Sequence, residues 1–110
     1  LPKVEFARPV ARLADREHAY HLYVVRLDTG RLGFSRDEAI ARLREAGIGA
    51  NVHYKPPYLH SYYRDQLGFS EGACPASEKA AMEIVTLPLF PRMADSDVDR
   101  VVGALADLAR

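Results

Sequence analysis

The chain has 110 residues, of which 48% are hydrophobic, and its 15 basic and 15 acidic residues give zero formal charge. This composition predicts one soluble globular domain with its own core, and no cluster of Lys and Arg offers the basic surface that nucleic acid binding requires. No segment approaches the roughly 18 consecutive apolar residues of a membrane span, and a single cysteine, Cys74, is typical of a reducing cytoplasm.

The N-terminal part predicts a connector followed by a strand. Residues 1–17 mix prolines and charges without a regular period, so we interpret them as a connector that continues from a preceding segment. Residues 20–27, YHLYVVRL, are rich in β-branched and aromatic side chains, with apolar residues at both odd and even positions. This pattern predicts a strand that is covered on both faces.

A helix and a second strand are expected next. Ser35 and Glu38 have the spacing of a capping box, and Gly47 is suited to a left-handed C-terminal cap, so a helix is predicted over 36–46. Alternation over 50–54 predicts a strand with one polar face, formed by Asn51 and His53.

The C-terminal half predicts further helices and one more strand. The aromatic segment after this second strand is expected to form a loop with a short helix near 61–67, and Pro75 is suited to begin a helix that ends near 84. A short apolar strand is predicted at 85–88 and a strongly amphipathic helix at 95–109. The expected fold is therefore a small α/β (α+β) domain, with a three-stranded sheet, helices on one face and one sheet face left over.

Four residues near the end of the second strand are the candidate binding residues: Asn51, His53, Tyr54 and Lys55. Strand ends and loops are where a rigid scaffold presents polar groups to a ligand. His53 could donate to an anionic oxygen and Lys55 could neutralise one, which suits a phosphate-bearing substrate. From the residues alone, ordinary polarity at a strand end remains an alternative explanation.

Other kinds of site find little support in the sequence. His53, His60 and Cys74 do not have the spacing of a zinc site, and no glycine-rich phosphate loop or nucleophile elbow occurs. The tyrosines between 54 and 63 could stack on a sugar or a base, or could pack the loop against a neighbour. The residues by themselves therefore indicate a small α/β domain with a polar strand end.

Three segments, taken in order, resemble the C-terminal domain of the DegT/DnrJ/EryC1/StrS aminotransferases: EHAYHLYVVRLD, SRDEAIARLREAGIGANVHYKPPYLHSYYRDQLGF and LPLFPRMADSDVDRVVGAL. The resemblance covers residues 18–110, which we expect to form the C-terminal small domain of an enzyme similar in fold to aspartate aminotransferase. It implies a cytoplasmic homodimer that uses pyridoxal phosphate to move an amino group from glutamate or glutamine to a nucleotide-linked keto sugar. The expected pathway is cell-surface polysaccharide or amino-sugar biosynthesis.

The resemblance also suggests roles for particular residues. The histidine of the family's H-Y pair is His53, which would orient the sugar nucleotide, and Tyr54, Lys55 and Asn51 are secondary candidates. Tyr58 stands where the family often has histidine, and the family's P-x-A-E element reads PASE at residues 75–78. These differences leave the sugar specificity open.

The cofactor chemistry is expected to lie elsewhere in the parent enzyme. In the family, the lysine that bonds the cofactor and the acid that pairs with its pyridine nitrogen belong to the large N-terminal domain. Lys3, Lys55 and Lys79 lie outside any segment that resembles the cofactor-lysine motif, so this chain alone is expected to hold no cofactor covalently and to be inactive. A stand-alone sugar-nucleotide-binding module and a folded gene fragment without activity remain alternatives.

Overall fold

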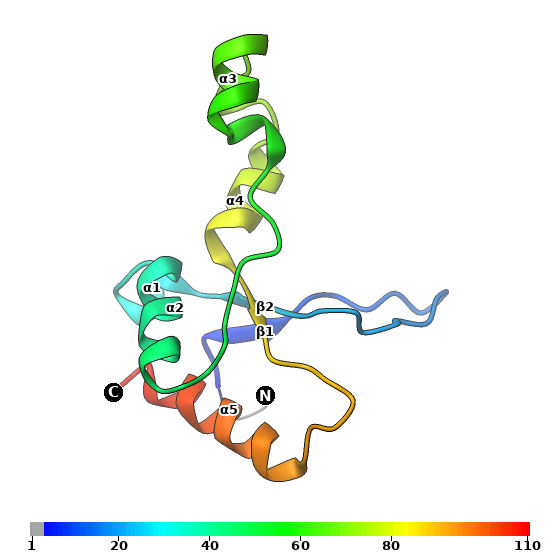
Figure 1. Ribbon diagram of the computed structural model, residues 1–110, viewed down its shortest axis with the longest axis vertical. Coiled ribbons are helices and arrows are strands. Elements are labelled where there is room, and N and C mark those ends of the chain that lie inside the picture. The colour runs from blue at the N-terminus through cyan, green and yellow to red at the C-terminus, as the bar shows by residue number, and fades with distance from the viewer. Residues whose placement is uncertain (1–3) are drawn as a thin grey trace.

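The computed structural model describes residues 4–110, and within them three strands form one antiparallel sheet in the order β1-β2-β3. In chain order the elements are β1 (Ala7–Pro9), β2 (Tyr23–Leu27), α1 (Thr29–Leu32), α2 (Arg36–Glu45), the 3-10 helix η1 (Pro57–Leu59), α3 (Ser61–Leu67), α4 (Pro75–Glu83), β3 (Ile84–Leu87) and α5 (Asp95–Asp107). The expected three-stranded sheet with helices is confirmed (Figure 1).

The edge strand β1 comes from the segment that was expected to be a connector. Its backbone pairs with β2 in the antiparallel register Ala7–Leu27. Ala7 is buried, as are the neighbouring Val4 and Phe6, so this short apolar stretch joins the core although it lacks a clear period. The interpretation of residues 1–17 as a simple connector was therefore wrong for residues 7–9.

The strand predicted at 50–54 does not form, and only an isolated bridge between Asn51 and Thr86 is present. The next pairing partners of this bridge would be Pro88, which has no N–H, and Ile84. The N–H of Ile84 already donates to the Ala80 carbonyl, and its carbonyl accepts from Arg36 Nη1 at 3.2 Å. Because neither neighbouring position has a free N–H to donate, the ladder does not extend beyond one bridge.

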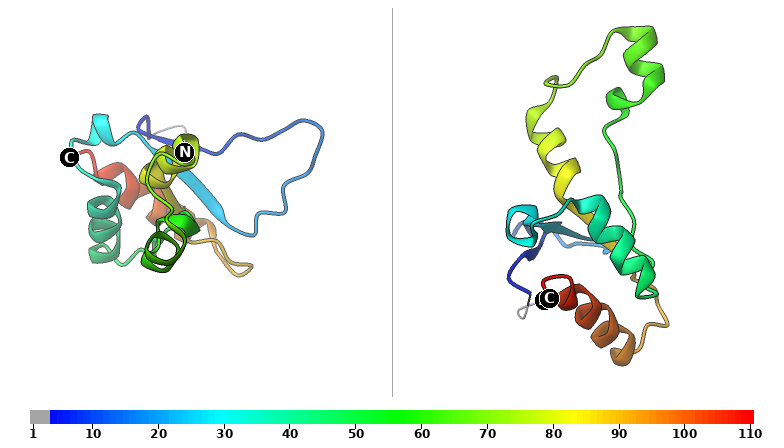
Figure 2. Two further views of the ribbon diagram at one scale, coloured as in Figure 1. Left: turned by 90° about the horizontal axis from the view of Figure 1, so that it is seen from above. Right: turned by 90° about the vertical axis from the view of Figure 1, so that its left-hand side faces the viewer.

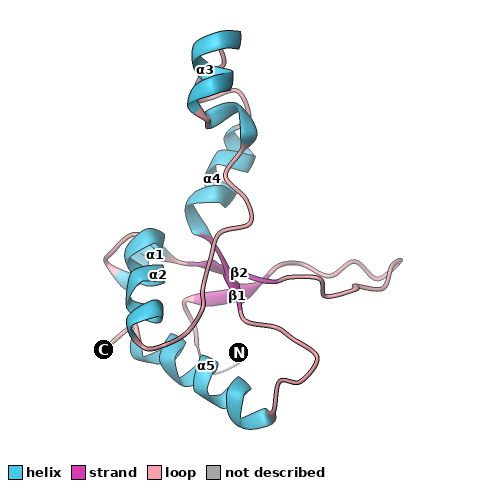
Figure 3. Cartoon of the chain, viewed as in Figure 1, coloured by secondary structure: helices cyan, strands magenta, loops and turns pink. Residues whose placement is uncertain are grey.

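The strand predicted over 20–27 begins only at Tyr23. Tyr20 has a φ of 49°, which lies in the left-handed region and is incompatible with extended strand backbone. The segment between β1 and β2 consequently leaves the sheet as a long loop without regular structure (Figure 3).

Helices α2 to α5 lie where the sequence predicts them, whereas α1 and η1 were not predicted. Ser35 Oγ accepts from the Glu38 N–H at 3.2 Å, which begins α2, and Gly47 has a left-handed φ of 76° just after its end. The Glu38 carboxylate does not complete the expected capping box, because it pairs with Arg42 one turn later at 2.5 Å. The sequence therefore determined both ends of this helix, with one cap contact exchanged for an ion pair.

The core lies between one face of the sheet and two helices. Val25 and its cross-strand partner Val85 are both fully buried, as is Leu27, and they pack with Leu43 of α2 and Leu105 of α5. The alternate residues of β2 point to the other face, where Arg26 is exposed. The helices cover one face, and the other face is left over within the described chain, as the predicted fold requires.

Helices α3 and α4 form an arm that extends away from the sheet (Figure 2). Neither helix contains a buried residue, and the radius of gyration of 15.5 Å exceeds the roughly 13 Å of a compact chain of this length. The arm is tied to the sheet because β3 begins at the residue directly after α4. In the part of the chain that the structure describes, no helix is both long enough and apolar enough for a membrane span.

Candidate functional site

A cleft of about 1070 Å³ lies along the arm. Its walls come from the segment around residues 52–60, from the two arm helices and the loop between them, and from the start of α2. The lining residues are Arg36, Asp37, Val52, Tyr54, Lys55, Pro56, Tyr58, Leu59, His60, Arg64, Phe69, Ser70, Glu71, Pro75, Glu78, Lys79, Ala81 and Met82.

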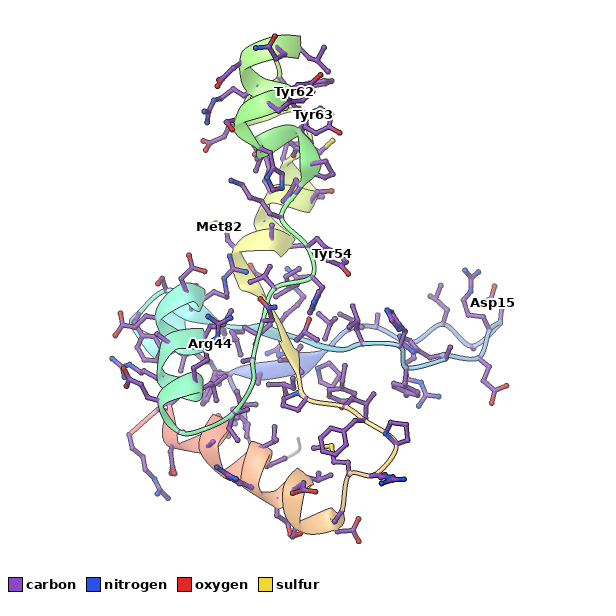
Figure 4. All side chains as sticks on the ribbon, viewed as in Figure 1. Asp15, Arg44, Tyr54, Tyr62, Tyr63 and Met82 are labelled. Atoms are coloured by element: carbon purple, nitrogen blue, oxygen red, sulfur yellow. The ribbon has the colours of Figure 1, made fainter. Side chains whose placement is uncertain are left out.

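Two of the four predicted binding residues, Tyr54 and Lys55, line this cleft. Tyr54 is 70% exposed and stands at the base of the arm, whereas Tyr62 and Tyr63 lie on α3 at its far end (Figure 4). Lys55 is exposed directly before Pro56, which is buried. The buried proline holds the backbone, so the two preceding side chains are presented to the cleft from an anchored position.

The other two predicted residues, Asn51 and His53, are engaged at β3 and do not line the cleft. Asn51 pairs with Thr86 through the backbone, and its side-chain oxygen accepts from the Val52 N–H at 2.9 Å. His53 is half-buried, and its Nδ1 lies 2.9 Å from the hydroxyl of Thr86. The structure therefore divides the predicted set into a pair at the cleft and a pair at the sheet.

Glu78 joins the two sides of the cleft. Its carboxylate accepts from the Tyr58 hydroxyl at 2.7 Å, from the Gly72 N–H at 2.9 and 3.0 Å, and from the Cys74 N–H at 3.3 Å. Partial burial, together with this hydrogen bond and the negative charge of Glu78, raises the pKa of Tyr58 to about 12. The hydrogen bonds from Tyr58, Gly72 and Cys74 lower the pKa of Glu78, so the ionised carboxylate is the form that holds the loop.

Arg36 supplies a nearly buried cation to the cleft, since its side chain is only 12% exposed. Its Nη1 donates to the Ile84 carbonyl, and its Nε lies 2.7 Å from the Asp37 carboxylate. The guanidinium is therefore held in place by the first residue of β3 and by its neighbour in α2.

The charges around the cleft favour an anionic ligand. Four cationic side chains line it against three carboxylates, and Glu78 is already hydrogen-bonded on several sides. Lys55 and Lys79 have no ion-pair partner among residues 4–110. Aromatic rings from Tyr54, Tyr58 and Phe69 also line the cleft. Cations beside aromatic faces can bind a molecule that carries both phosphate oxygens and planar or apolar rings.

Sequence reasoning missed the contributions of α4 and of the helix start at Arg36. For α4 a signal was present in the sequence. Tyr58 and residues 75–78, at the start of α4, are where the chain differs from the family's motifs, and Tyr58 contacts Glu78 in the structure. No comparable signal marked Arg36 or Lys79, since their places in the cleft depend on packing between distant segments.

The described residues do not form a pyridoxal phosphate site. Its binding needs a lysine that can bond the aldehyde and an acid beside the pyridine nitrogen. Lys55 and Lys79 are exposed, and Glu78, an acid of the same cleft, is occupied by Tyr58 and backbone N–H groups. Lys3 lies outside the described residues. In the described part of the chain, no group of three or more metal-ligating side chains occurs either.

Comparison with known proteins identifies a family. A family model described as the DegT/DnrJ/EryC1/StrS aminotransferase family matches residues 2–106. Among curated proteins, the chain is 39% identical over 97 residues to the spore coat polysaccharide biosynthesis protein SpsC of Bacillus subtilis strain 168, which covers 87% of this chain and 25% of SpsC.

Solved structures agree with this match. The aminotransferase TlmJ from Streptoalloteichus hindustanus aligns with a TM-score of 0.79 and 33% identity, over 98% of this chain and 27% of TlmJ. Spr1654 from Streptococcus pneumoniae, described as a candidate sugar aminotransferase, aligns with a TM-score of 0.82 and 31% identity, over 94% of this chain and 26% of Spr1654. Spr1654 has been solved in apo, pyridoxal phosphate and pyridoxamine phosphate forms. The chain thus spans about a quarter of the length of these relatives.

Proposed function

Because the chain belongs to the DegT/DnrJ/EryC1/StrS aminotransferase family, we propose that it is the C-terminal part of a transaminase that moves an amino group from glutamate or glutamine to a nucleotide-linked keto sugar. The names of its relatives support this proposal, since they include aminotransferases and a polysaccharide biosynthesis protein. The pyridoxal and pyridoxamine forms of Spr1654 are the two states between which an amino-group carrier alternates. In the proposed enzyme, the cofactor supplies this carrier chemistry.

The role of this chain is to bind and orient the sugar nucleotide. The observation that carries this role is that Tyr54 and Lys55, predicted from the sequence, line one cleft together with Tyr58 and Phe69. A nucleotide-linked sugar has a diphosphate that Lys55 can neutralise, and it has ring faces that aromatic side chains can cover. The family's substrate chemistry and the composition of the cleft therefore match.

His53 is proposed to orient the substrate from the adjoining sheet edge. The Thr86 hydroxyl lies 2.9 Å from Nδ1, which fixes the plane of the ring, and Nε2 makes no hydrogen bond within residues 4–110. If the Thr86 hydroxyl donates to Nδ1, the proton of the neutral ring lies on Nε2, where it can be donated to a substrate oxygen. Asn51 is a weaker candidate for substrate binding, because its side-chain oxygen already accepts from the Val52 N–H.

The cofactor lysine and its acidic partner are proposed to belong to a large N-terminal domain of the parent enzyme. This assignment accords with the exposed positions of Lys55 and Lys79 and with the one-quarter coverage of the relatives. The proposal includes a homodimeric, cytoplasmic parent enzyme in cell-surface polysaccharide or amino-sugar biosynthesis. The chain alone is expected to bind no cofactor covalently and to have no transaminase activity.

A chimera tests the proposal. The matching C-terminal segment of SpsC is replaced by this chain, and the purified protein is assayed with glutamate and a panel of nucleotide-linked keto sugars. The proposal predicts amination of at least one nucleotide-linked sugar and none of the same sugar without its nucleotide. A chimera that folds and binds pyridoxal phosphate but aminates no nucleotide-linked sugar would contradict it.

The isolated chain provides the matched comparison. The chain and a Lys55→Gln variant are each titrated with the nucleoside diphosphate that forms part of the best nucleotide-linked sugar substrate. Saturable binding that the variant weakens supports the role of the cleft. Equal binding by both proteins would remove Lys55 from the proposed site.

A further inference from the structure

Two arginines face each other on the open side of the sheet. Arg8 in β1 is the direct cross-strand partner of Arg26 in β2, so both side chains leave the same face. Cα atoms of directly paired antiparallel residues are only about 4.5–5.5 Å apart. Like charges in this arrangement are destabilising unless an opposite charge lies between or beside them.

The nearby carboxylates compensate only one of the cations. Glu83 at the end of α4 accepts from Arg26 at 2.8 and 2.5 Å and forms its ion pair. Asp28 accepts from the Arg31 N–H at 3.1 Å, and its carboxylate lies 3.7 Å from the Arg31 guanidinium. Both acids are therefore engaged by other groups, and Arg8 has no ion-pair partner among the residues that the structure describes.

A second cation without an ion-pair partner among residues 4–110 lines the same cavity as Arg8. Lys79 is exposed on α4, one helical turn before Glu83, and it too lacks an ion pair within the described chain. The Arg26–Glu83 pair fastens the end of α4 to β2, so Lys79 is held above the sheet. Arg8, Arg26, Lys79 and Glu83 all line one cavity of about 550 Å³.

We infer that this cavity, the Arg8 pocket, binds a phosphate group. The group would be contacted by Arg8 and Lys79, with Arg26 beside them. A phosphate dianion balances the two uncompensated cations with one group, and its oxygens match the planar fork of a guanidinium. An anion there would also relieve the repulsion between Arg8 and Arg26.

The Arg8 pocket is distinct from the proposed sugar-nucleotide cleft. Tyr54, Lys55, Tyr58 and Phe69 line the cleft and not the pocket, whereas Arg8 and Arg26 line the pocket and not the cleft. Lys79 borders both cavities. Substitutions at Arg8 and Lys55 can therefore test the two sites separately.

The test measures phosphate binding to the purified chain by amide NMR, with inorganic phosphate added at constant ionic strength in chloride at about pH 8, where phosphate is mostly a dianion. We expect saturable shifts at residues 8, 26 and 79. Arg8→Gln should weaken binding roughly tenfold, because a charge-assisted contact is lost. Arg92→Gln removes an exposed arginine outside the pocket, with the same change in net charge, and should leave the affinity unchanged.

Further measurements identify the source of the phosphate and test whether each variant is folded. Tighter binding of glycerol phosphate than of inorganic phosphate would indicate an ester ligand, and the reverse order would indicate the free anion. Lys79→Gln lies on a different element and should weaken binding as Arg8→Gln does, while circular dichroism verifies that each variant is folded. Shifts that do not saturate, or equal weakening by Arg8→Gln and Arg92→Gln, would overturn the inference. Lys55→Gln should not affect phosphate binding here, whatever it does to the cleft.

Discussion

The hydroxyl of Tyr58 donates a 2.7 Å hydrogen bond to the carboxylate of Glu78, which lies twenty residues further along the chain. Tyr58 stands where the resembled family often has histidine, and Glu78 keeps the glutamate of the family's P-x-A-E element. The same carboxylate holds the backbone of Gly72 and Cys74. This contact therefore connects the segment that carries Tyr54 and Lys55 to α4 across the cleft.

The Tyr58 hydroxyl should make stability sensitive to alkaline pH. Its pKa is raised from the ordinary value of 10.0 to about 12, so the folded state holds the proton more tightly than the unfolded state does. The contribution to stability is fully present below pH 10 and is lost as the pH rises towards about 12. Urea unfolding across this range should show that loss in the native chain. Tyr58→Phe should lack that part of the pH dependence, and an identical slope in both proteins would refute the assignment.

The Glu78 carboxylate should make the stability of the fold sensitive to acidic pH. Its pKa is lowered below 4.5 by its hydrogen bonds, so its stabilisation is present above that value and is lost as the pH falls through the lower pKa of the folded state. Glu78→Gln should flatten the acid limb of the stability profile, because an amide does not titrate. Glu71→Gln, an exposed residue of the same cleft, serves as the matched control. If both variants keep the native profile, Glu78 does not contribute in this way.

Gly47 and Gly103 should respond to alanine with opposite signs. Gly47 has a φ of 76°, and an added Cβ would lie 2.7 Å from Arg100 Nη2, so Gly47→Ala should destabilise the fold by about 1 kcal/mol or more. Gly103 lies within α5 with nothing within 4 Å of an added Cβ. Gly103→Ala should therefore stabilise the chain by roughly 0.4–1 kcal/mol. Thermal unfolding of both variants tests the pair, and shifts of the same sign would contradict it.

His53→Ala should separate the two half-reactions in the SpsC chimera. Loss of a hydrogen bond to a charged substrate group costs on the order of 1.5–3 kcal/mol, so use of the sugar nucleotide should fall roughly ten- to a hundredfold while reaction with glutamate is nearly unchanged. Thr86→Val removes the hydroxyl that lies 2.9 Å from Nδ1 and should cause a smaller loss of the same kind. Steady-state rates with each substrate measure the split. An equal fall in both half-reactions would make His53 a structural residue.

The local elements could be predicted from the sequence because their signals are local. Ser35 and Gly47 mark the ends of α2, and the apolar stripe through Val101 and Leu105 marks the buried face of α5. The segment at 50–54 shows the limit of such reasoning. Its alternation resembles a strand, yet pairing depends on the free backbone groups of Ile84 and Pro88, which lie more than thirty residues away.

The sequence by itself determined the family resemblance, the helix boundaries and the candidate residues Asn51, His53, Tyr54 and Lys55, because capping, periodicity and motif order are properties of neighbouring residues. Only the tertiary structure decided that Tyr54 and Lys55 line a cleft with Lys79, that His53 lies against Thr86, and that Arg8 faces Arg26. These relationships depend on strand register and on the direction in which α4 leaves the sheet. The burial of Val25 against Val85 favours the strand register, and the ion pair between Arg26 and Glu83 favours the direction of α4. Such long-range contacts leave no signal in a local sequence pattern.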